Sequence, residues 1–171
     1  MAKRITTKIG TRDIEILTAI DRCPLTVAQL CELSETFTSQ LTNADNLRRR
    51  LRQLAGAGFV SSFPYCIAGD GRSPRYFKLT KDGYRLIYGQ DAVFPRRRYF
   101  TEISPGHHHH TYCLAQTIVW LCITASRNGC EVLHFARENS VRLVAESIVL
   151  SRYKATHLRE QQNQAANQPD H

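Results

Sequence analysis

A cluster of side chains between residues 43 and 53 carries the chemical groups that proteins use to bind nucleic acids. Guanidinium groups grip phosphates or offer a paired donor set to guanine, and the carboxamides of Asn and Gln pair similarly with adenine. In a helix over this stretch, the three-and-four spacing places Ala44, Leu47, Leu51 and Leu54 on one face. The opposite face carries Asn46, Arg49, Arg50 and Gln53. The pattern predicts a helix that packs on one side and is free to bind on the other, although its arginines could also be merely solvated.

The charge of the chain favours a polyanionic partner. The 171 residues are 42% apolar and carry a formal net charge of +8, with a pI near 9.4. Residues 1–88 hold 14 Lys and Arg against 8 Asp and Glu, whereas residues 89–171 hold 9 against 7. We therefore expect two units, with the basic surface mainly in the first.

The cysteines and histidines do not show the spacing of a metal site. The six cysteines form no C-x-x-C pair, and adjacent histidines at His107–His110 cannot all aim at one ion. We expect reduced thiols, a capping or solvent-exposed His cluster, and no metal or cofactor. No signal peptide or membrane-spanning stretch is evident, so the sequence predicts a soluble, cytoplasmic protein without a membrane partner.

Capping residues and apolar spacing predict the elements around the basic helix. Thr11 is expected to cap a first helix with Ile14, Leu17, Ala19 and Ile20 inward, and Thr26 a second. Asn43 would cap the basic helix, with Gly56 and Gly58 at its exit. Residues 60–65 and 75–79 read as strands of a hairpin with a long tip, and Thr80 would cap a closing helix over 81–88.

This order of three helices, a hairpin and a closing helix resembles the winged helix-turn-helix domain. Two phrases strengthen the resemblance, LRQLAGAGFV at 51–60 and YFKLTKDGYRL at 76–86. The resemblance implies an α+β fold over residues 10–88, a recognition helix at 44–55 in the major groove of double-stranded DNA, and a wing at 66–74. Under that interpretation the base-reading residues are Asn46, Arg49, Arg50 and Gln53. The expected DNA backbone contacts are Asn43, Arg48, Arg52, Arg72, Ser73, Arg75 and Lys78.

The second half of the chain is less explicit. Residues 89–106 read as a basic linker or irregular arm in which Arg96, Arg97 and Arg98 are candidate contacts to flanking DNA, or a solvated charge run. Residues 107–160 are expected to form a helix and strand region, with a largely buried helix at 112–127, a strand at 131–136 and an apolar segment at 141–153. So much apolar surface favours homodimerisation. Residues 161–171 read as a disordered tail.

A narrower resemblance involves the closing phrase Leu-Thr-Lys-Asp-Gly, the helix that begins near His110, and Arg137-Glu138. These features resemble the replication-relaxation family of plasmid and mobile-element proteins, which implies that the chain could belong to a larger nuclease-like protein. The leading interpretation is a non-enzymatic, sequence-specific DNA-binding regulator, a repressor acting as a homodimer. A replication-relaxation or nuclease subunit and a winged-helix adaptor for a protein partner remain alternatives.

Overall fold

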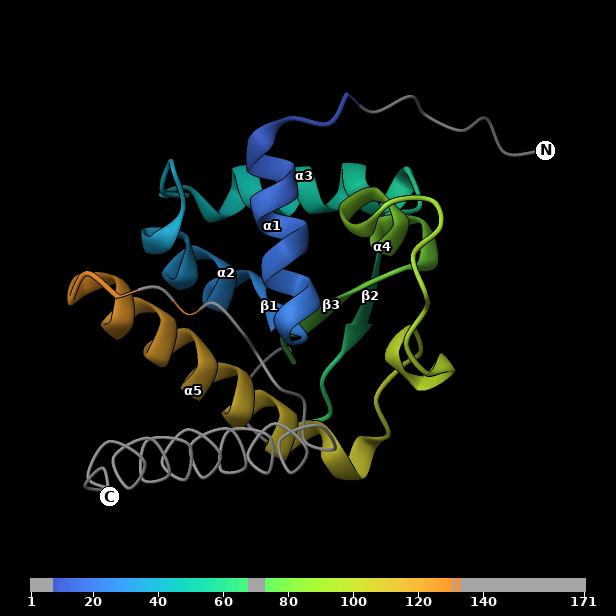
Figure 1. Cartoon of the computed structure of the whole chain (residues 1–171). Helices are drawn as coiled ribbons and strands as arrows, with labels where there is room; N and C mark the ends of the chain where they lie inside the picture. The colour runs from blue at the N-terminus through green and yellow to red at the C-terminus, as the bar shows by residue number, and fades with distance from the viewer. Residues whose placement is uncertain (1–7, 68–72, 131, 133–171) are drawn as a thin grey trace, which may run out of the picture. The chain divides into compact units, whose positions relative to one another are not determined.

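The computed structural model describes residues 8–67, 73–130 and 132, and all of them belong to one unit, Met1–Val132. Its helices are α1 (Thr11–Arg22), α2 (Val27–Leu33), α3 (Ala44–Gly56), α4 (Lys81–Tyr88) and α5 (His108–Arg127) (Figure 1). Short 3-10 helices occur at Ser34–Thr36 (η1), Arg97–Tyr99 (η2) and Pro105–His107 (η3). The strands are β1 (Leu25–Thr26), β2 (Val60–Pro64) and β3 (Arg75–Leu79).

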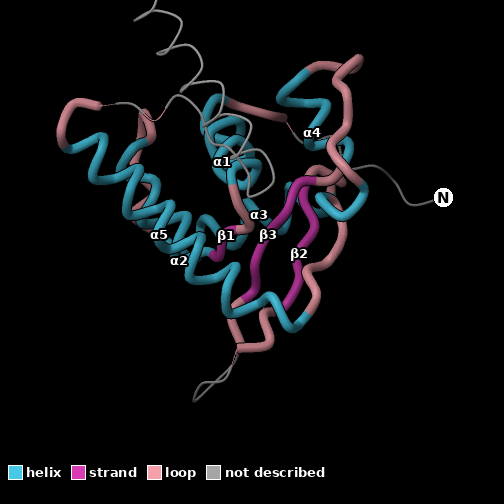
Figure 2. The backbone as a smooth tube through the Cα atoms, turned by 60° about the horizontal axis from the view of Figure 1, so that its bottom comes forward, coloured by secondary structure: helices cyan, strands magenta, loops and turns pink. Residues whose placement is uncertain are grey.

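The three strands form one antiparallel sheet in the order β1-β3-β2 (Figure 2). In the hairpin Ser62 lies opposite Phe77, and β1 adds Leu25 beside that same phenylalanine. Three helices, a hairpin whose second strand pairs with a short strand before α2, and a closing helix constitute a winged helix-turn-helix fold. The prediction of an α+β fold is confirmed, and the structure adds the short strand β1, which the sequence did not predict.

Most of the expected helix boundaries are confirmed by their caps. The Thr26 hydroxyl accepts from the Gln29 N–H at 3.3 Å, and the Asn43 side chain accepts from the N–H groups of Asp45 and Asn46 at 2.9 and 3.0 Å. The first cap was wrong: Gly10 precedes α1, and its N–H donates to Asp13 at 2.8 Å. The carboxylate of Asp13 in the first turn thus binds the N–H of the N-cap residue, while Thr11 is the first residue of the helix itself.

Two glycines have specific reasons to be glycine. Gly58, just beyond the end of α3, has a φ of +86°, which side chains rarely adopt, and it turns the chain into β2. Gly83 in α4 lies so close to the α3–β2 turn that an added Cβ would stand 2.1 Å from the carbonyl oxygen of Phe59. Gly56 has neither property, since it is helical and its Cβ position is open.

The core lies between α1, α2, α3 and the sheet. Its largest fully buried apolar side chains include Ile16, Leu17, Leu25, Leu30, Leu33, Leu51, Leu54 and Leu79. The expected inward positions of α1 at Leu17, Ala19 and Ile20 are buried, while Ile14 is only half-buried and Ile16 replaces it. Each helix of the trihelical core therefore buries one stripe, as its spacing predicts.

The segment between α4 and α5 packs against the hairpin and α4. Buried Tyr76 accepts through its hydroxyl from the Ile103 N–H at 2.9 Å, and the ring of Tyr84 lies 5.9 Å from that of Phe100. Residues 94–103, which we call the arm, are therefore packed, and the expectation of an unpacked linker is corrected. The aromatic residues distributed along this segment provide the apolar surface that an unpacked linker would lack.

Helix α5 lies beside α2 (Figure 2). The Gln29 side chain donates to the Tyr112 carbonyl at 3.3 Å, and Arg127 pairs with Glu35 at 2.6 Å. The buried face of α5 carries Ala115, Ile118, Val119 and Cys122. Three apolar residues of its other side are exposed, namely Leu114, Trp120 and Leu121. The helix is therefore apolar on more than one face, and the burial of this second face by another copy of the chain stays a prediction.

The expected strand at 131–136, the apolar segment at 141–153, Glu138 and the tail at 161–171 lie outside the described residues, apart from Val132. The same holds for Arg72 and the wing tip at 68–72. Across the described ranges, every helix is too short or too polar to span a bilayer.

Candidate nucleic-acid interface

The two faces of α3 differ as its sequence predicts. Leu47, Leu51 and Leu54 are buried, and the side chains on the other side are exposed: Asn46, Arg48, Arg49, Arg52 and Gln53. The helix begins at a capped N-terminus and ends at the Gly58 turn, so its length and rotation are determined by the sequence itself. This gives the protein a rigid helix with a continuous strip of hydrogen-bond donors.

Contacts within this exposed strip are those of ordinary surface side chains. Arg48 pairs with Asp45 one turn earlier at 2.6 Å, and Arg49 donates to the Asn46 carboxamide oxygen at 3.3 Å. Arg52 donates to the Arg48 carbonyl at 3.4 Å. Exposed pairs of this kind contribute little stability, about 0–1 kcal/mol, so a ligand can replace them at small cost.

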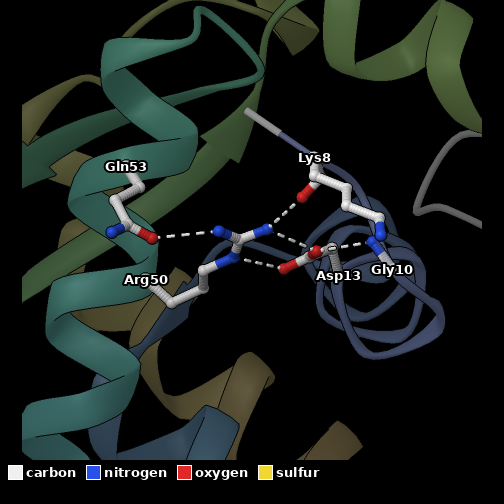
Figure 3. A network of polar contacts seen from close by, with 5 residues as sticks. All are labelled: Lys8, Gly10, Asp13, Arg50 and Gln53. Carbon is white, nitrogen blue, oxygen red and sulfur yellow. Dashed lines mark hydrogen bonds and ion pairs between the residues drawn. The ribbon is translucent and has the colours of Figure 1, made fainter. Parts of the chain in front are cut away.

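Arg50 is the exception on α3, because it is held by acceptors from α1 and the chain before it (Figure 3). Its Nε and Nη2 donate to the two carboxylate oxygens of Asp13, both at 2.6 Å. Nη2 also donates to the Lys8 carbonyl at 2.8 Å, and Nη1 donates to the Gln53 side-chain oxygen at 2.9 Å. In this arrangement Arg50 is part of the protein's own polar network, and direct base reading by Arg50 stays a prediction.

The Asp13–Arg50 pair shifts the pKa values of both partners. Burial by itself would raise the pKa of Asp13, but hydrogen bonds from Arg50 and the Gly10 N–H, together with the charges of Arg50 and Arg12, outweigh it and lower that pKa. The hydrogen bond to Asp13 raises the pKa of Arg50. Both groups are therefore charged at neutral pH, and the pair is a charge-assisted bidentate contact.

The base of the wing presents exposed polar groups. Ser73 and Arg75 are exposed, and Arg75 donates to the hydroxyl and the carbonyl of Ser62 across the hairpin at 2.9 and 2.8 Å. The guanidinium is thereby held against β2 while remaining accessible to solvent. This fits the expectation that Arg75 faces a partner.

Lys78 differs from the expectation for a backbone contact. Only 7% of the residue is exposed, and its ammonium donates to the carbonyls of Arg98 at 3.1 Å and Thr101 at 2.6 Å. Strand alternation explains the difference, since Lys78 lies two residues after Tyr76 and faces the arm as Tyr76 does. In this structure Lys78 therefore anchors the arm, and its role as a DNA backbone contact stays a prediction.

The arm presents three exposed arginines, Arg96, Arg97 and Arg98, around η2. Lys78 holds the main chain at Arg98, and the adjacent Tyr99 donates through its hydroxyl to Asp21 at the end of α1. Tyr88 of α4 donates to the same carboxylate at 2.7 Å. The triple-arginine run, expected on a linker, is thus carried by an anchored segment.

One member of the His cluster is structural. His108 is buried: its Nδ1 accepts from the Cys66 N–H at 2.7 Å, and its Nε2 lies 2.9 Å from the Ile103 carbonyl. A carbonyl oxygen can only accept, so Nε2 carries the hydrogen, and Nδ1 carries none because it accepts from the Cys66 N–H. His107, His109 and His110 are exposed, and residues 8–67, 73–130 and 132 contain no group of three metal-ligating side chains.

Sequence reasoning missed the residues that support this interface. Asp13 was given no role at the interface, and the aromatic anchors of the arm were not recognised. The only available signal for Asp13 was an acid at the third position of a basic-flanked helix, which is common in any helix. The thiols of Cys23 and Cys122 are buried, and burial raises the pKa of Cys23 to about 12. Those of Cys66, Cys113 and Cys130 are exposed.

The chain has few recognisable relatives among known proteins. No protein-family model and no curated protein matches the chain, so the narrower resemblance to the replication-relaxation family is unsupported. One similar solved structure is Bacillus subtilis PadR in complex with operator DNA, at 13% identity and a TM-score of 0.41. The match covers 96% of this chain and 82% of that chain. Likeness at this level supplies no site residues.

Proposed function

We propose that this protein binds double-stranded DNA in a sequence-specific manner and acts as a transcriptional regulator. The observation that carries the proposal is the two-faced α3, whose buried leucines fix its position while Asn46, Arg49 and Gln53 are exposed along the opposite side. A capped helix on a winged helix-turn-helix scaffold is the element that enters the major groove.

In this proposal the exposed groups divide between two tasks. Asn46, Arg49 and Gln53 read base edges, because carboxamide and guanidinium groups match the donor and acceptor patterns of adenine and guanine. Arg48, Arg52, Ser73 and Arg75 contact the DNA backbone, and Arg96, Arg97 and Arg98 contact flanking phosphates. Asn43 contributes mainly as the cap of α3, since its side-chain oxygen is already occupied there. Arg72 remains a candidate outside the described residues.

We further propose that the regulator is a homodimer that represses by occupying its operator. The exposed apolar side of α5 supports this, with Trp120 61%, Leu121 45% and Leu114 39% exposed. These residues lie at positions that share one side of a helix, and a second copy would remove them from water. A two-fold dimer would place two recognition helices on a palindromic site.

The test is selection of bound duplexes from a random library, followed by affinity measurements over a salt series. We expect a palindromic consensus, and loss of preference at one base pair for Arg49→Ala, which costs about 1–3 kcal/mol at that position. Arg85→Ala, which removes a half-buried arginine that pairs with Asp82 on α4, is the control and should keep the consensus preference. Absence of any enriched sequence would reject specific recognition, and weak, salt-independent affinity would favour a protein-binding adaptor.

The homodimer is tested separately by solution mass. Trp120→Glu should convert a dimer to a monomer, because a carboxylate cannot be buried in an apolar interface without a partner. Thr117→Glu lies on the exposed side one turn earlier and tests whether the effect extends along α5. A wild-type mass equal to 19.5 kDa at concentrations that saturate the duplex would reject the dimer.

A further inference from the structure

The guanidinium of Arg50 is almost fully used by acceptors within the protein. A guanidinium has five N–H groups, and four of them donate here: one from Nε and one from Nη2 to Asp13, one from Nη2 to Lys8, and one from Nη1 to Gln53. One N–H is left without an acceptor among the described residues. A paired donor set for guanine needs two, so Arg50 cannot supply it while these contacts hold.

The contact to Gln53 determines how that side chain faces outward. Arginine only donates hydrogen bonds, so the atom of Gln53 that lies 2.9 Å from Nη1 is the carboxamide oxygen. The amide NH₂ is then directed away from Arg50, on an exposed residue of the reading face. Gln53 consequently presents its donor in one orientation instead of rotating freely, and that orientation depends on Arg50.

Arg50 is in turn oriented by α1. Asp13 is 5% exposed, and its carboxylate is held by the Gly10 N–H at 2.8 Å as well as by the guanidinium. A partly buried, bidentate, charge-assisted pair restricts the guanidinium to few orientations, whereas a solvated arginine has many. The chain of contacts runs from Gly10 through Asp13 and Arg50 to Gln53, with each link at 2.9 Å or less (Figure 3).

We propose that Asp13 is a specificity-determining positioning residue of the DNA interface: acting through Arg50, it orients the Gln53 carboxamide for one base pair. The inference rests on the proposed function, since it presumes that Gln53 reads a base. It assigns the readout at that base pair to a carboxylate on α1, outside the recognition helix. It also assigns Arg50 the role of a brace in place of a base reader.

The experiment measures affinity for the selected duplex and for its single-base-pair variants, using the full-length chain. Gln53→Ala should lose discrimination at one base pair by about tenfold or more. Asp13→Asn and Arg50→Lys should lose discrimination at that same base pair by at least about fivefold, because neither preserves the charged fork. Adding Asp13→Asn to Gln53→Ala should cause no further loss there, since both act on one contact.

The controls separate positioning from charge and from folding. Asp82→Asn removes an acid from α4 and adds the same unit of charge, yet it should keep discrimination at every base pair. Thermal midpoints and affinity for a random duplex report whether Asp13→Asn is folded and binds DNA, and Arg50→Lys provides a milder second variant. A structural defect alone would weaken all duplexes alike and would leave the discrimination ratios unchanged.

The possible results have distinct meanings. Normal discrimination by Asp13→Asn at the Gln53 base pair overturns the inference while leaving the proposed function intact. Loss at a different base pair for Arg50→Ala than for Gln53→Ala would also overturn it, because Arg50 would then read its own base. A wild-type protein without preference for any duplex rejects the proposed function, and the inference with it.

Discussion

Replacing Lys78 by Met tests whether this lysine anchors the arm or grips DNA. Met preserves most of the buried aliphatic volume and removes the ammonium that donates to the Arg98 and Thr101 carbonyls at 3.1 and 2.6 Å. Hydrogen bonds to charged groups contribute about 1.5–3 kcal/mol each. Part of that is offset because the buried charge is removed as well. We therefore expect a loss of about 2–3 kcal/mol in the free energy of unfolding.

The assay is urea unfolding followed by circular dichroism, together with duplex affinity over a salt series. A loss of this size should lower the urea midpoint by roughly 1 M. Arg75→Met is the matched control on the same strand, since Arg75 is exposed where Lys78 is buried. It should change the free energy of unfolding by less than about 0.5 kcal/mol and reduce the salt slope by about 0.9, the value of one phosphate contact.

The opposite pattern would refute the anchoring role. If Lys78→Met left the urea midpoint unchanged and reduced the salt slope by about 0.9, the ammonium would be contacting phosphate in the complex. Hydrogen exchange adds a local test: amides of the arm should lose protection in Lys78→Met and keep it in Arg75→Met. Unchanged protection in both variants would contradict the idea that Lys78 holds the arm in place.

The remaining predictions concern stability and its pH dependence. Tyr65→Phe should raise the free energy of unfolding by about 1 kcal/mol, because the buried Tyr65 hydroxyl has no hydrogen-bond partner among the described residues; a lower urea midpoint would contradict this. Gly83→Ala should lower the free energy of unfolding by about 2 kcal/mol or more, because the added methyl group clashes with the backbone, whereas Gly56→Ala should raise it by about 0.5–1 kcal/mol. Equal urea midpoints for the two variants would refute the close approach at Gly83. The pKa of Asp13 is lower in the folded state than in the unfolded chain, so the charged carboxylate stabilises the folded protein. This contribution is fully present above the unfolded pKa of about 3.9 and is lost as the pH falls through the folded pKa. Urea unfolding should accordingly show Asp13→Asn to be less stable than wild type at about pH 7, with the difference narrowing below about pH 4; a pH-independent difference would exclude the charged pair as its cause.

The features that could be predicted from sequence are those whose cause is local. The capped start of α3 and its buried leucine stripe follow from residues within one or two turns of each other. The hairpin was equally accessible, since its strands are short and separated by a loop rich in Gly and Pro. In these elements the residue types and the tertiary packing favour the same conformation, so the resemblance to winged helix-turn-helix proteins identified the fold correctly.

The features that could not be predicted depend on residues far apart in the chain. Asp13 and Arg50 are 37 positions apart, and Lys78 is 20 positions from its acceptor Arg98. Composition identifies all of them as charged, and a charged residue is solvated far more often than it is buried. Only the contact between the start of α1 and the middle of α3, and the packing of the arm against β3, decide which charges are used inside the protein.

Basic residues that bind acceptors within the protein do not add to its affinity for DNA. Residues 43–52 and 72–78 contain seven Lys and Arg, but Arg50 and Lys78 bind acceptors of the protein itself. With Arg49 assigned to a base and Arg72 outside the described residues, three phosphate contacts remain per protomer: Arg48, Arg52 and Arg75. Each contributes about 0.9 to the salt slope, so these three give roughly 3, and an arm that also binds DNA through its three arginines gives roughly 5. The slope therefore reports whether the anchored arm is part of the interface, which the net charge of the chain cannot reveal.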